Sequence, residues 1–175
     1  MKFEKTGLVV ISFLFVFLVG ISIMSIQPKE EVLTNAIEVA EQQFEQESKE
    51  QNKQVENFSL YLPEGYEVEE QNNSNLLLNK EEKTFILFYN KLETRTSRLN
   101  YEAAKEINNH EWLEAFEDKE RFGYINIMVR DEVFEVELGV GGVKVTTRSS
   151  KEELVSDVGD MMDIASSIAY EEKGA

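Results

Sequence analysis

A single uninterrupted run of twenty uncharged residues, 7–26, limits what the N-terminal part of this chain can fold into. About twenty helical residues span the roughly 30 Å hydrocarbon core of a bilayer. Leu, Ile, Val and Phe supply most of the run, and a charged residue at the centre of such a helix would cost about 2.5–3.5 kcal/mol on the insertion scale. The run therefore predicts a transmembrane helix that anchors the chain to a lipid bilayer.

A cleaved secretory signal is the alternative interpretation of this run. The apolar region of a signal peptide is usually about 7–15 residues long, which is shorter than the run. The run contains no Ala, and Gly20-Ile21-Ser22 is the nearest match to a small-x-small cleavage site. A lipid anchor on a cysteine is excluded because the chain has no Cys. These features favour a retained, single-pass helix.

The residues on either side of the run predict its orientation. Lys2 and Lys5 precede it, and positive charge stays on the cytoplasmic side of a membrane. Residues 1–6 are therefore predicted to be cytoplasmic and everything from Gln27 onward extracytoplasmic. The bias towards Lys, Glu, Asn and Ile is typical of a bacterial chain from an AT-rich genome. We expect a protein of the bacterial cell membrane.

The remaining sequence is strongly acidic. Residues 27–175 hold 16 basic and 33 acidic side chains, a net charge of −17. Binding to nucleic acid needs clustered Lys and Arg, so the sequence argues against a nucleic-acid partner. The acidic surface is expected to keep the domain soluble, or alternatively to bind a cationic protein partner or calcium. Without Cys, disulfides, thiolate nucleophiles and Cys-ligated zinc are excluded.

An acidic helical stalk is predicted over residues 27–57, between the anchor and the folded domain. Its apolar residues form one helical stripe: Leu33, Ile37, Ala40 and Phe44. The stripe covers only about two heptads, fewer than the three to four that indicate a coiled coil. At 1.5 Å per residue, a solvated helix of this length would raise the domain by roughly 40 Å.

One extracytoplasmic domain is predicted over residues 58–171, followed by a tail at 172–175. Periodicity and turn residues predict a helix over 99–107 and eight strands: 58–62, 66–70, 76–78, 85–89, 111–117, 122–129, 133–138 and 143–147. The later links are short enough only for antiparallel hairpins. Strands 76–78 and 85–89 are apolar on both faces, so helices are expected on both sides of the sheet. The predicted fold is an α+β, α/β/α sandwich.

The clearest helix of the domain closes it. Ser150 and Glu153 have the spacing of a capping box. The residues that follow repeat with the period of one helical face and are expected to pack on the sheet: Leu154, Val158, Met161, Ala165 and Ile168.

Two segments of the chain resemble PsbP-like domains. Phe58-Ser59-Leu60-Tyr61-Leu62-Pro63-Glu64-Gly65-Tyr66 is similar to their opening strand and turn, and Asp163-Ile164-Ala165-Ser166-Ser167-Ile168 is similar to their final helix. The final segment also resembles the closing helix of bacterial lipoprotein domains of unknown function. The resemblance implies an antiparallel sheet between helices, in a domain that binds or assembles. It implies no catalytic residues.

Side chains with catalytic potential are few. His110 is the only histidine, and it falls in a segment that reads as an exposed loop. A catalytic histidine would need an orienting carboxylate and a nucleophile, and the sequence does not indicate them. Trp112 is expected to be a core residue. No catalytic residue and no cofactor site is predicted.

Acidic clusters are the remaining candidates for a metal site. Asp157, Asp160 and Asp163 recur every three residues on the final helix, beside its apolar stripe. Calcium takes six to eight oxygens from a wrapping loop, which a straight helix does not supply, so a solvated face is expected. The pairs Glu69-Glu70, Glu81-Glu82 and Glu152-Glu153 are expected to be exposed. The loop 139–142 is expected to be a hairpin turn, and no metal site is predicted.

Three function classes remain open. The favoured one is a membrane-anchored interaction or assembly module of the bacterial envelope, without catalysis. The second is an accessory or sensory subunit that pairs through its anchor with another membrane protein. The third is a hydrolase that uses carboxylates alone, which needs two acids about 5–9.5 Å apart in a cleft.

Overall fold

The computed structural model describes residues 7, 10–17, 28–56, 58–72, 74–107 and 111–168. It has an α+β fold with an antiparallel sheet and helices, as predicted. The elements from residue 28 onward are α2 (Lys29–Glu45), β1 (Lys53–Gln54), β2 (Ser59–Leu60), β3 (Tyr66–Gln71), β4 (Asn75–Lys80), β5 (Lys83–Tyr89), α3 (Leu99–Lys105), β6 (Trp112–Glu117), β7 (Phe122–Arg130), β8 (Val133–Val140), β9 (Val143–Ser149) and α4 (Leu154–Ser167).

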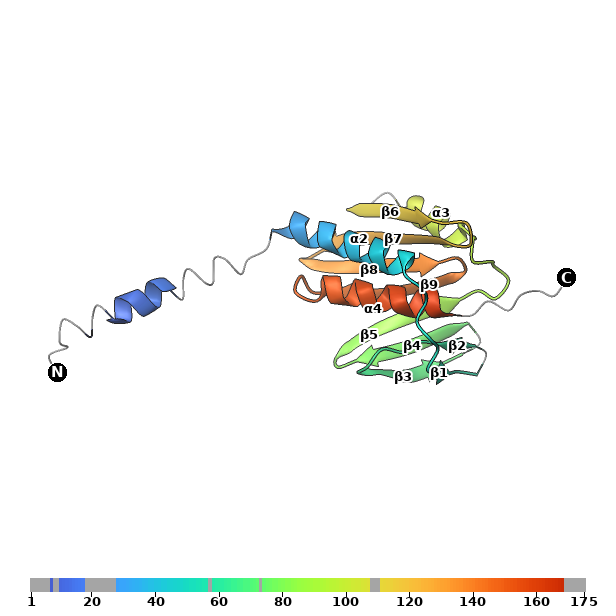
Figure 1. The fold of residues 1–175 in the computed structure, drawn as a ribbon, viewed down its shortest axis with the longest axis horizontal. Coiled ribbons are helices and arrows are strands. Elements are labelled where there is room, and N and C mark those ends of the chain that lie inside the picture. Colours follow the sequence, from blue (N-terminus) through green and yellow to red (C-terminus); the bar gives the residue numbers. More distant parts are fainter. Residues whose placement is uncertain are drawn as a thin grey trace.

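Seven strands form the main sheet, in the order β3-β4-β5-β9-β8-β7-β6. Every neighbouring pair in it is antiparallel. The chain makes the β3-β4-β5 meander first, then passes through α3 to β6 at the far edge. It returns by hairpins until β9 closes the sheet against β5 (Figure 1). The predicted hairpin links are confirmed; strand 58–62 is shorter than predicted and pairs with β1 outside the main sheet.

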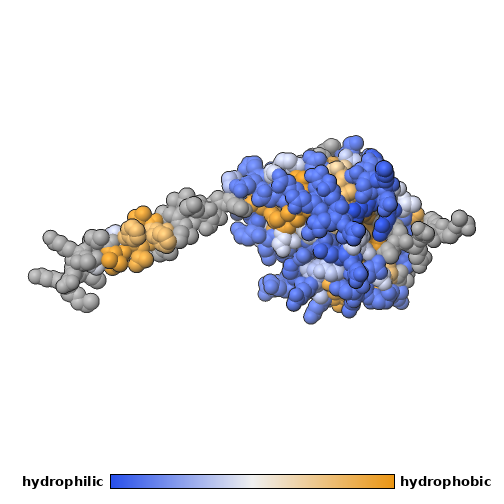
Figure 2. All heavy atoms as spheres, viewed as in Figure 1, coloured by the Kyte–Doolittle hydropathy of each residue, from blue (hydrophilic) through white to orange (hydrophobic). Residues whose placement is uncertain are grey.

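Helices α2 and α4 lie side by side across one face of the sheet (Figure 1). We call this the helix-covered face. The predicted stripe of α4 is confirmed, because all five of its side chains are completely buried. They meet the inward side chains of β8 and β9, among them Val136, Leu138 and Val145. Outward, the surface over these helices is mostly hydrophilic (Figure 2).

The start of α4 differs from the predicted capping box. The Ser150 hydroxyl donates to the Glu153 carboxylate at 2.8 Å, so the two residues do meet. Glu153 is the N-cap residue, however, and no side-chain hydrogen bond caps the backbone there. Its carboxylate instead forms an ion pair with the Lys83 ammonium of β5, 3.0 Å away.

The prediction of a solvated stalk is wrong for α2, which belongs to the core. Its buried side chains are Val32, Leu33, Ala36, Ala40 and Phe44, each no more than 2% exposed. The Phe44 ring lies against Gly123, where a Cβ atom would come within 2.7 Å of it. The Arg121 guanidinium covers the same ring, 4.6 Å from its centroid. The apolar stripe seen in the sequence therefore faces α4 and the sheet, and the folded unit begins near residue 28.

The opposite face of the sheet is covered by a helix only at one end. There, Tyr101 of α3 packs edge-on against Phe122 and Tyr124 of β7, with ring centroids 5.4 and 6.1 Å apart. Ala104 completes this small second cluster. No described helix covers strands β3, β4, β5, β9 and β8 on this side. The predicted second helical layer is therefore present over β6 and β7 alone, and we call the rest the open face.

The predicted anchor lies mostly outside the described residues. Residues 10–17 are helical. Among the residues that the structure describes, no helix is long and apolar enough to cross a membrane.

Candidate functional site

On the open face of the sheet, paired residues of neighbouring strands line up in rows that run across the strands. The central row runs across six strands, through Leu77, Ile86, Thr146, Glu137, Asn126 and Leu113. On β4, β5, β8 and β7 the residues on either side of each belong to the helix-covered core, for example Leu76 and Leu78 around Leu77. Because side chains alternate along a strand, the row must face the open side.

A cavity of about 890 Å³ lies on this open face. It extends over β5, β9, β8 and β7 and reaches the β4–β5 turn and the start of α4. Its lining combines apolar, hydroxyl and charged groups: Lys80, Glu81, Glu82, Lys83, Thr84, Ile86, Met128, Glu135, Val136, Glu137, Thr146, Thr147, Arg148 and Glu153. Ligand sites have volumes of about 300–1,000 Å³ and place a few polar groups on an apolar floor. The cavity has the size and composition of a binding site.

Glu135 is held between two arginines at one side of the cavity. The Arg148 guanidinium donates to one carboxylate oxygen at 2.7 and 3.1 Å. The Arg130 Nε atom lies 2.9 Å from the other oxygen. Arg148 itself is 77% exposed, so it lies at the rim and can also reach a bound molecule.

Glu137 anchors a second polar group deeper in the open face. The buried Tyr124 hydroxyl donates to its carboxylate at 2.7 Å, and the Lys144 ammonium lies 3.8 Å away. Burial and the Glu137 charge both raise the pKa of Tyr124, so the phenol stays protonated. Gly139 makes room for this ring, because a Cβ atom there would come within 2.7 Å of it. The carboxylate is thereby fixed in position beside the cavity.

Asn126 lies between Glu137 and Leu113 in the central row, and its side chain has no partner. It is completely buried, yet neither its amide nitrogen nor its amide oxygen makes a hydrogen bond. Such a buried, unpaired amide costs about 1–3 kcal/mol, so one in a folded chain calls for an explanation. Two neighbours of Asn126, Met128 and Glu137, line the cavity.

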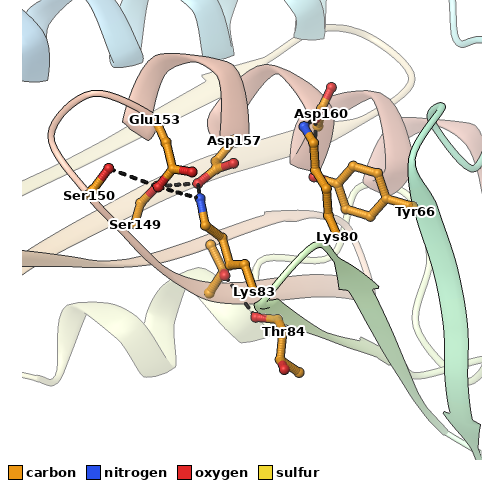
Figure 3. A network of polar contacts seen from close by, with 10 residues as sticks. Tyr66, Lys80, Lys83, Thr84, Ser149, Ser150, Glu153, Asp157 and Asp160 are labelled. Atoms are coloured by element: carbon orange, nitrogen blue, oxygen red, sulfur yellow. Dashed lines mark hydrogen bonds and ion pairs between the residues drawn. The ribbon is translucent and has the colours of Figure 1, made fainter.

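An ion-pair network around the buried Asp157 (Figure 3) places Lys83 and Glu153 at one end of the cavity. The Lys83 ammonium contacts Asp157 at 2.5 Å and Glu153 at 3.0 Å. The Ser149 hydroxyl also donates to Asp157. Burial alone would lower the pKa of Lys83, but its hydrogen bonds to the two carboxylates outweigh burial and raise that pKa. The same Lys83 contact, with that of Ser150, lowers the pKa of Glu153.

A second network joins the next turn of α4 to β3 and β4 (Figure 3). Both the Tyr66 hydroxyl and the Lys80 ammonium donate to one oxygen of Asp160, at 3.1 and 2.8 Å. Burial, followed by the charge of Asp160, raises the pKa of Tyr66. The two networks fix the β4–β5 turn to α4.

The structure corrects the expectation that the three aspartates of α4 form a solvated face. Asp157 is only 2% exposed and Asp160 is half-buried, and both have cationic partners. Asp163 is also partly buried; burial raises its pKa, against the opposing effect of Lys49. Asp157 and Asp160 lie against Lys83 and Lys80 beside the β4–β5 turn, and no local pattern in the sequence indicates these long-range ion pairs.

The other predicted residues fall into three groups. Trp112 packs against the main core as expected, and the predicted hairpin turn is present at 141–142 between β8 and β9, where 139 and 140 are already strand residues. Glu81 and Glu82 are exposed as expected, and both line the cavity. His110 lies outside the described residues. No group of three or more His, Cys, Asp or Glu side chains is placed to hold a metal ion within the described part of the chain.

Sequence reasoning missed the cavity, although one signal for it was present. Glu135 and Glu137 occupy the polar positions of an alternating strand, which usually means a solvated face. Only the sheet order shows that β8 is an inner strand, so these carboxylates lie in the middle of the open face. Comparisons of the chain with protein-family models, with curated proteins and with solved structures found no match.

Proposed function

We propose that this chain is a single-pass, membrane-anchored module of a bacterial envelope, and that it binds or assembles with a protein partner through its open face. The observation that carries the proposal is the cavity of about 890 Å³ across four strands of a sheet face that no helix of the described residues covers. Sheets with apolar residues on both faces are normally covered on both sides. A partner would supply the missing cover.

The anchor is supported by the apolar run 7–26 and by its described part. The large apolar side chains within 10–17 are all 53–74% exposed: Val10, Ile11, Phe13, Leu14, Phe15, Val16 and Phe17. Seven large apolar side chains among eight successive helical residues point in every direction around the helix axis, and the face of this segment seen in Figure 2 is hydrophobic. A helix that is apolar all round needs a protein core or a bilayer around it. The flanking Lys2 and Lys5 favour an extracytoplasmic domain.

The PsbP-like resemblance supports the same class of function. An antiparallel sheet with a closing helix agrees in layout with such domains, which bind or assemble. The accessory or sensory subunit that pairs through its anchor remains the second candidate, because the helix 10–17 exposes so many apolar side chains.

Catalysis by carboxylates alone is the third candidate, and the cavity supplies a pair for it, Glu135 and Glu137. A glycosidase of this kind needs one protonated acid and one free carboxylate. Here two arginines hold Glu135, while Tyr124 and Lys144 hold Glu137. Both carboxylates are engaged by groups of the chain itself, so we propose a module that is not an enzyme.

Crosslinking in native membranes tests this proposal. An amine-reactive crosslinker reaches Lys144 at the open face and Lys2 and Lys5 beside the predicted anchor, and mass spectrometry identifies the attached peptides. We expect a protein partner attached through Lys144. Crosslinks confined to Lys2 and Lys5 would favour the accessory subunit. Crosslinks to no protein at all would overturn the proposal.

A further inference from the structure

We propose that the open face receives a cationic amphipathic helix of the protein partner. This inference rests on the proposed function and names the chemistry of the partner. Three features of the face carry it: an exposed apolar centre, an acidic border on strand β3, and a width that suits one helix.

The apolar centre consists of side chains of the adjacent strands β4 and β5 that do not belong to the buried core. Ile86 is 46% exposed in the middle of β5. Its cross-strand neighbour Leu77 and the residue Phe88 are only partly buried, although both lie on inner strands. Met128 of β7 also lines the cavity, on the far side of β9 and β8 from these side chains. Apolar side chains left exposed together on an inner part of a sheet mark an interaction surface.

The acidic border is produced by a β-bulge in β3. Glu67 pairs with Asn79, and Glu69 accepts a hydrogen bond from the Asn79 amide at 2.9 Å, so both lie on the open face. The bulge between Val68 and Glu70 shifts the register by one residue, and Glu70 then pairs with Leu77 on that same face. An inserted residue re-aims the side chains that follow it. Three carboxylates therefore border the apolar centre.

The charge of this border is not neutralised within the described part of the chain. No ion pair joins Glu67, Glu69 or Glu70 to a basic side chain there. On the other side of the apolar centre, Glu135 and Glu137 already have Arg and Lys partners. Basic residues of a partner are therefore attracted towards β3, while its apolar residues lie over Ile86.

The dimensions favour a helix over an extended strand. From β3 to β8 the open face spans four strand spacings, about 19 Å. One helix with its side chains is about 10–12 Å across, so it fits between the β3 border and α3. An extended partner would instead pair with a sheet edge, and the bulge and the three glutamates make the β3 edge a poor template. A helix here would complete the second layer that α3 covers only in part.

Site-specific photo-crosslinking in native membranes tests this. The full chain carries p-benzoyl-phenylalanine in place of Ile86, or in place of Thr146 as a second open-face position. Glu38, exposed on α2 at the helix-covered face, is the matched control position. We expect adducts from both open-face positions and none from Glu38, and the attached peptide should be net positive with apolar residues every three to four positions.

The outcomes separate this inference from the proposed function. Adducts from the Glu38 position alone would overturn the proposal of a partner helix on the open face, but would still agree with a binding module. An acidic peptide, a peptide without helical periodicity, lipid, or a second copy of this chain at Ile86 would each overturn the inference. Adducts from no position would overturn both proposals.

A binding measurement tests the charge argument. The attached segment is synthesised as a peptide and titrated into the full chain in phosphatidylcholine nanodiscs, with empty nanodiscs as the blank. Glu67→Gln and Glu70→Gln should each weaken binding about two- to fivefold, as expected for exposed ion pairs. Glu38→Gln and Glu41→Gln make the same charge change on the other face, beyond the roughly 8 Å screening length, and should leave affinity unchanged. An equal loss of affinity in the Glu67 and Glu70 variants and in the Glu38 and Glu41 variants would show that the acidic border does not determine docking.

Discussion

The Lys83 ammonium nitrogen lies 2.5 Å from a carboxylate oxygen of Asp157, and this contact joins the β4–β5 turn to α4. The Asp157 side chain is only 3% exposed, and the Ser149 hydroxyl also donates to it. A buried carboxylate is tolerated only when it is paired and hydrogen-bonded. The position of α4 on the sheet therefore depends on a charge as well as on its apolar stripe.

Asp157→Asn should lower the free energy of unfolding by about 3–5 kcal/mol, because it leaves the Lys83 ammonium without its buried partner. Urea denaturation of the purified chain measures this. Asp163→Asn is the matched control on the same helix: burial raises the pKa of Asp163, so its charge is unfavourable in the folded state and its removal should not destabilise. Equal losses in the two variants would contradict the structural role of the Lys83 contact.

Phe44→Ala should lower the free energy of unfolding by about 3–5 kcal/mol, as for other buried aromatic residues. The reason is that Phe44 is 2% exposed and packs on Gly123 and on Phe116, with ring centroids 5.8 Å apart. Denaturant unfolding checks the size of the effect, and Glu38→Ala on the exposed side of α2 should change little. If Phe44→Ala were as mild as Glu38→Ala, α2 would be a stalk after all.

Local patterns predicted most of the elements correctly because their causes are local. The strand 133–138 alternates apolar and polar residues, and it and the strand 122–129 are bounded by short turns; the two are present as β8 and β7. The stripe from Leu154 to Ile168 predicted α4 and its buried side. In each case the residues that decide the structure lie within a few positions of one another.

The wrong predictions concern the packing partners of each helix or sheet face, which a local sequence pattern does not specify. The stripe of α2 is the same whether it faces solvent, a second copy or the sheet, and only the fold places Phe44 on Gly123. Asp157 looked exposed because its partner Lys83 is 74 residues away in the chain. The open face was missed for a related reason: apolar residues at Leu77 and Ile86 indicated a cover, and the cover is absent over these strands in the described part of the chain.

Stability should fall as the pH rises above about 10, the ordinary pKa of Tyr and close to that of Lys. Three groups hold their protons more tightly when the chain is folded: Tyr66, Tyr124 and Lys83 all have raised pKa values. Above their ordinary pKa values the unfolded chain releases these protons while the folded chain keeps them. The unfolded state then binds fewer protons, so the free energy of unfolding decreases with pH.

Urea denaturation at several pH values between 8 and 11 tests this. The free energy of unfolding should be nearly constant below about pH 9 and decline above about pH 10. Tyr124→Phe removes one of the three groups and should flatten the decline. Tyr61→Phe, at a partly exposed tyrosine, is the matched control. A decline that Tyr124→Phe leaves as steep as in the wild type would exclude Tyr124 as a contributor.

Millimolar calcium should leave the melting temperature of the chain unchanged. Two of the three aspartates of α4 are already occupied, Asp157 by Lys83 and Asp160 by Lys80 and the Tyr66 hydroxyl, and burial disfavours the charge of the third, Asp163, by raising its pKa. Calcium needs six to eight oxygens, and these three side chains come from one straight helix. A ligand that bound the folded state would raise the melting temperature by linkage. Thermal melts with calcium, with magnesium and with a chelator provide the comparison. A gain of several degrees that is specific to calcium and lost in Asp160→Asn would instead make α4 a cation site.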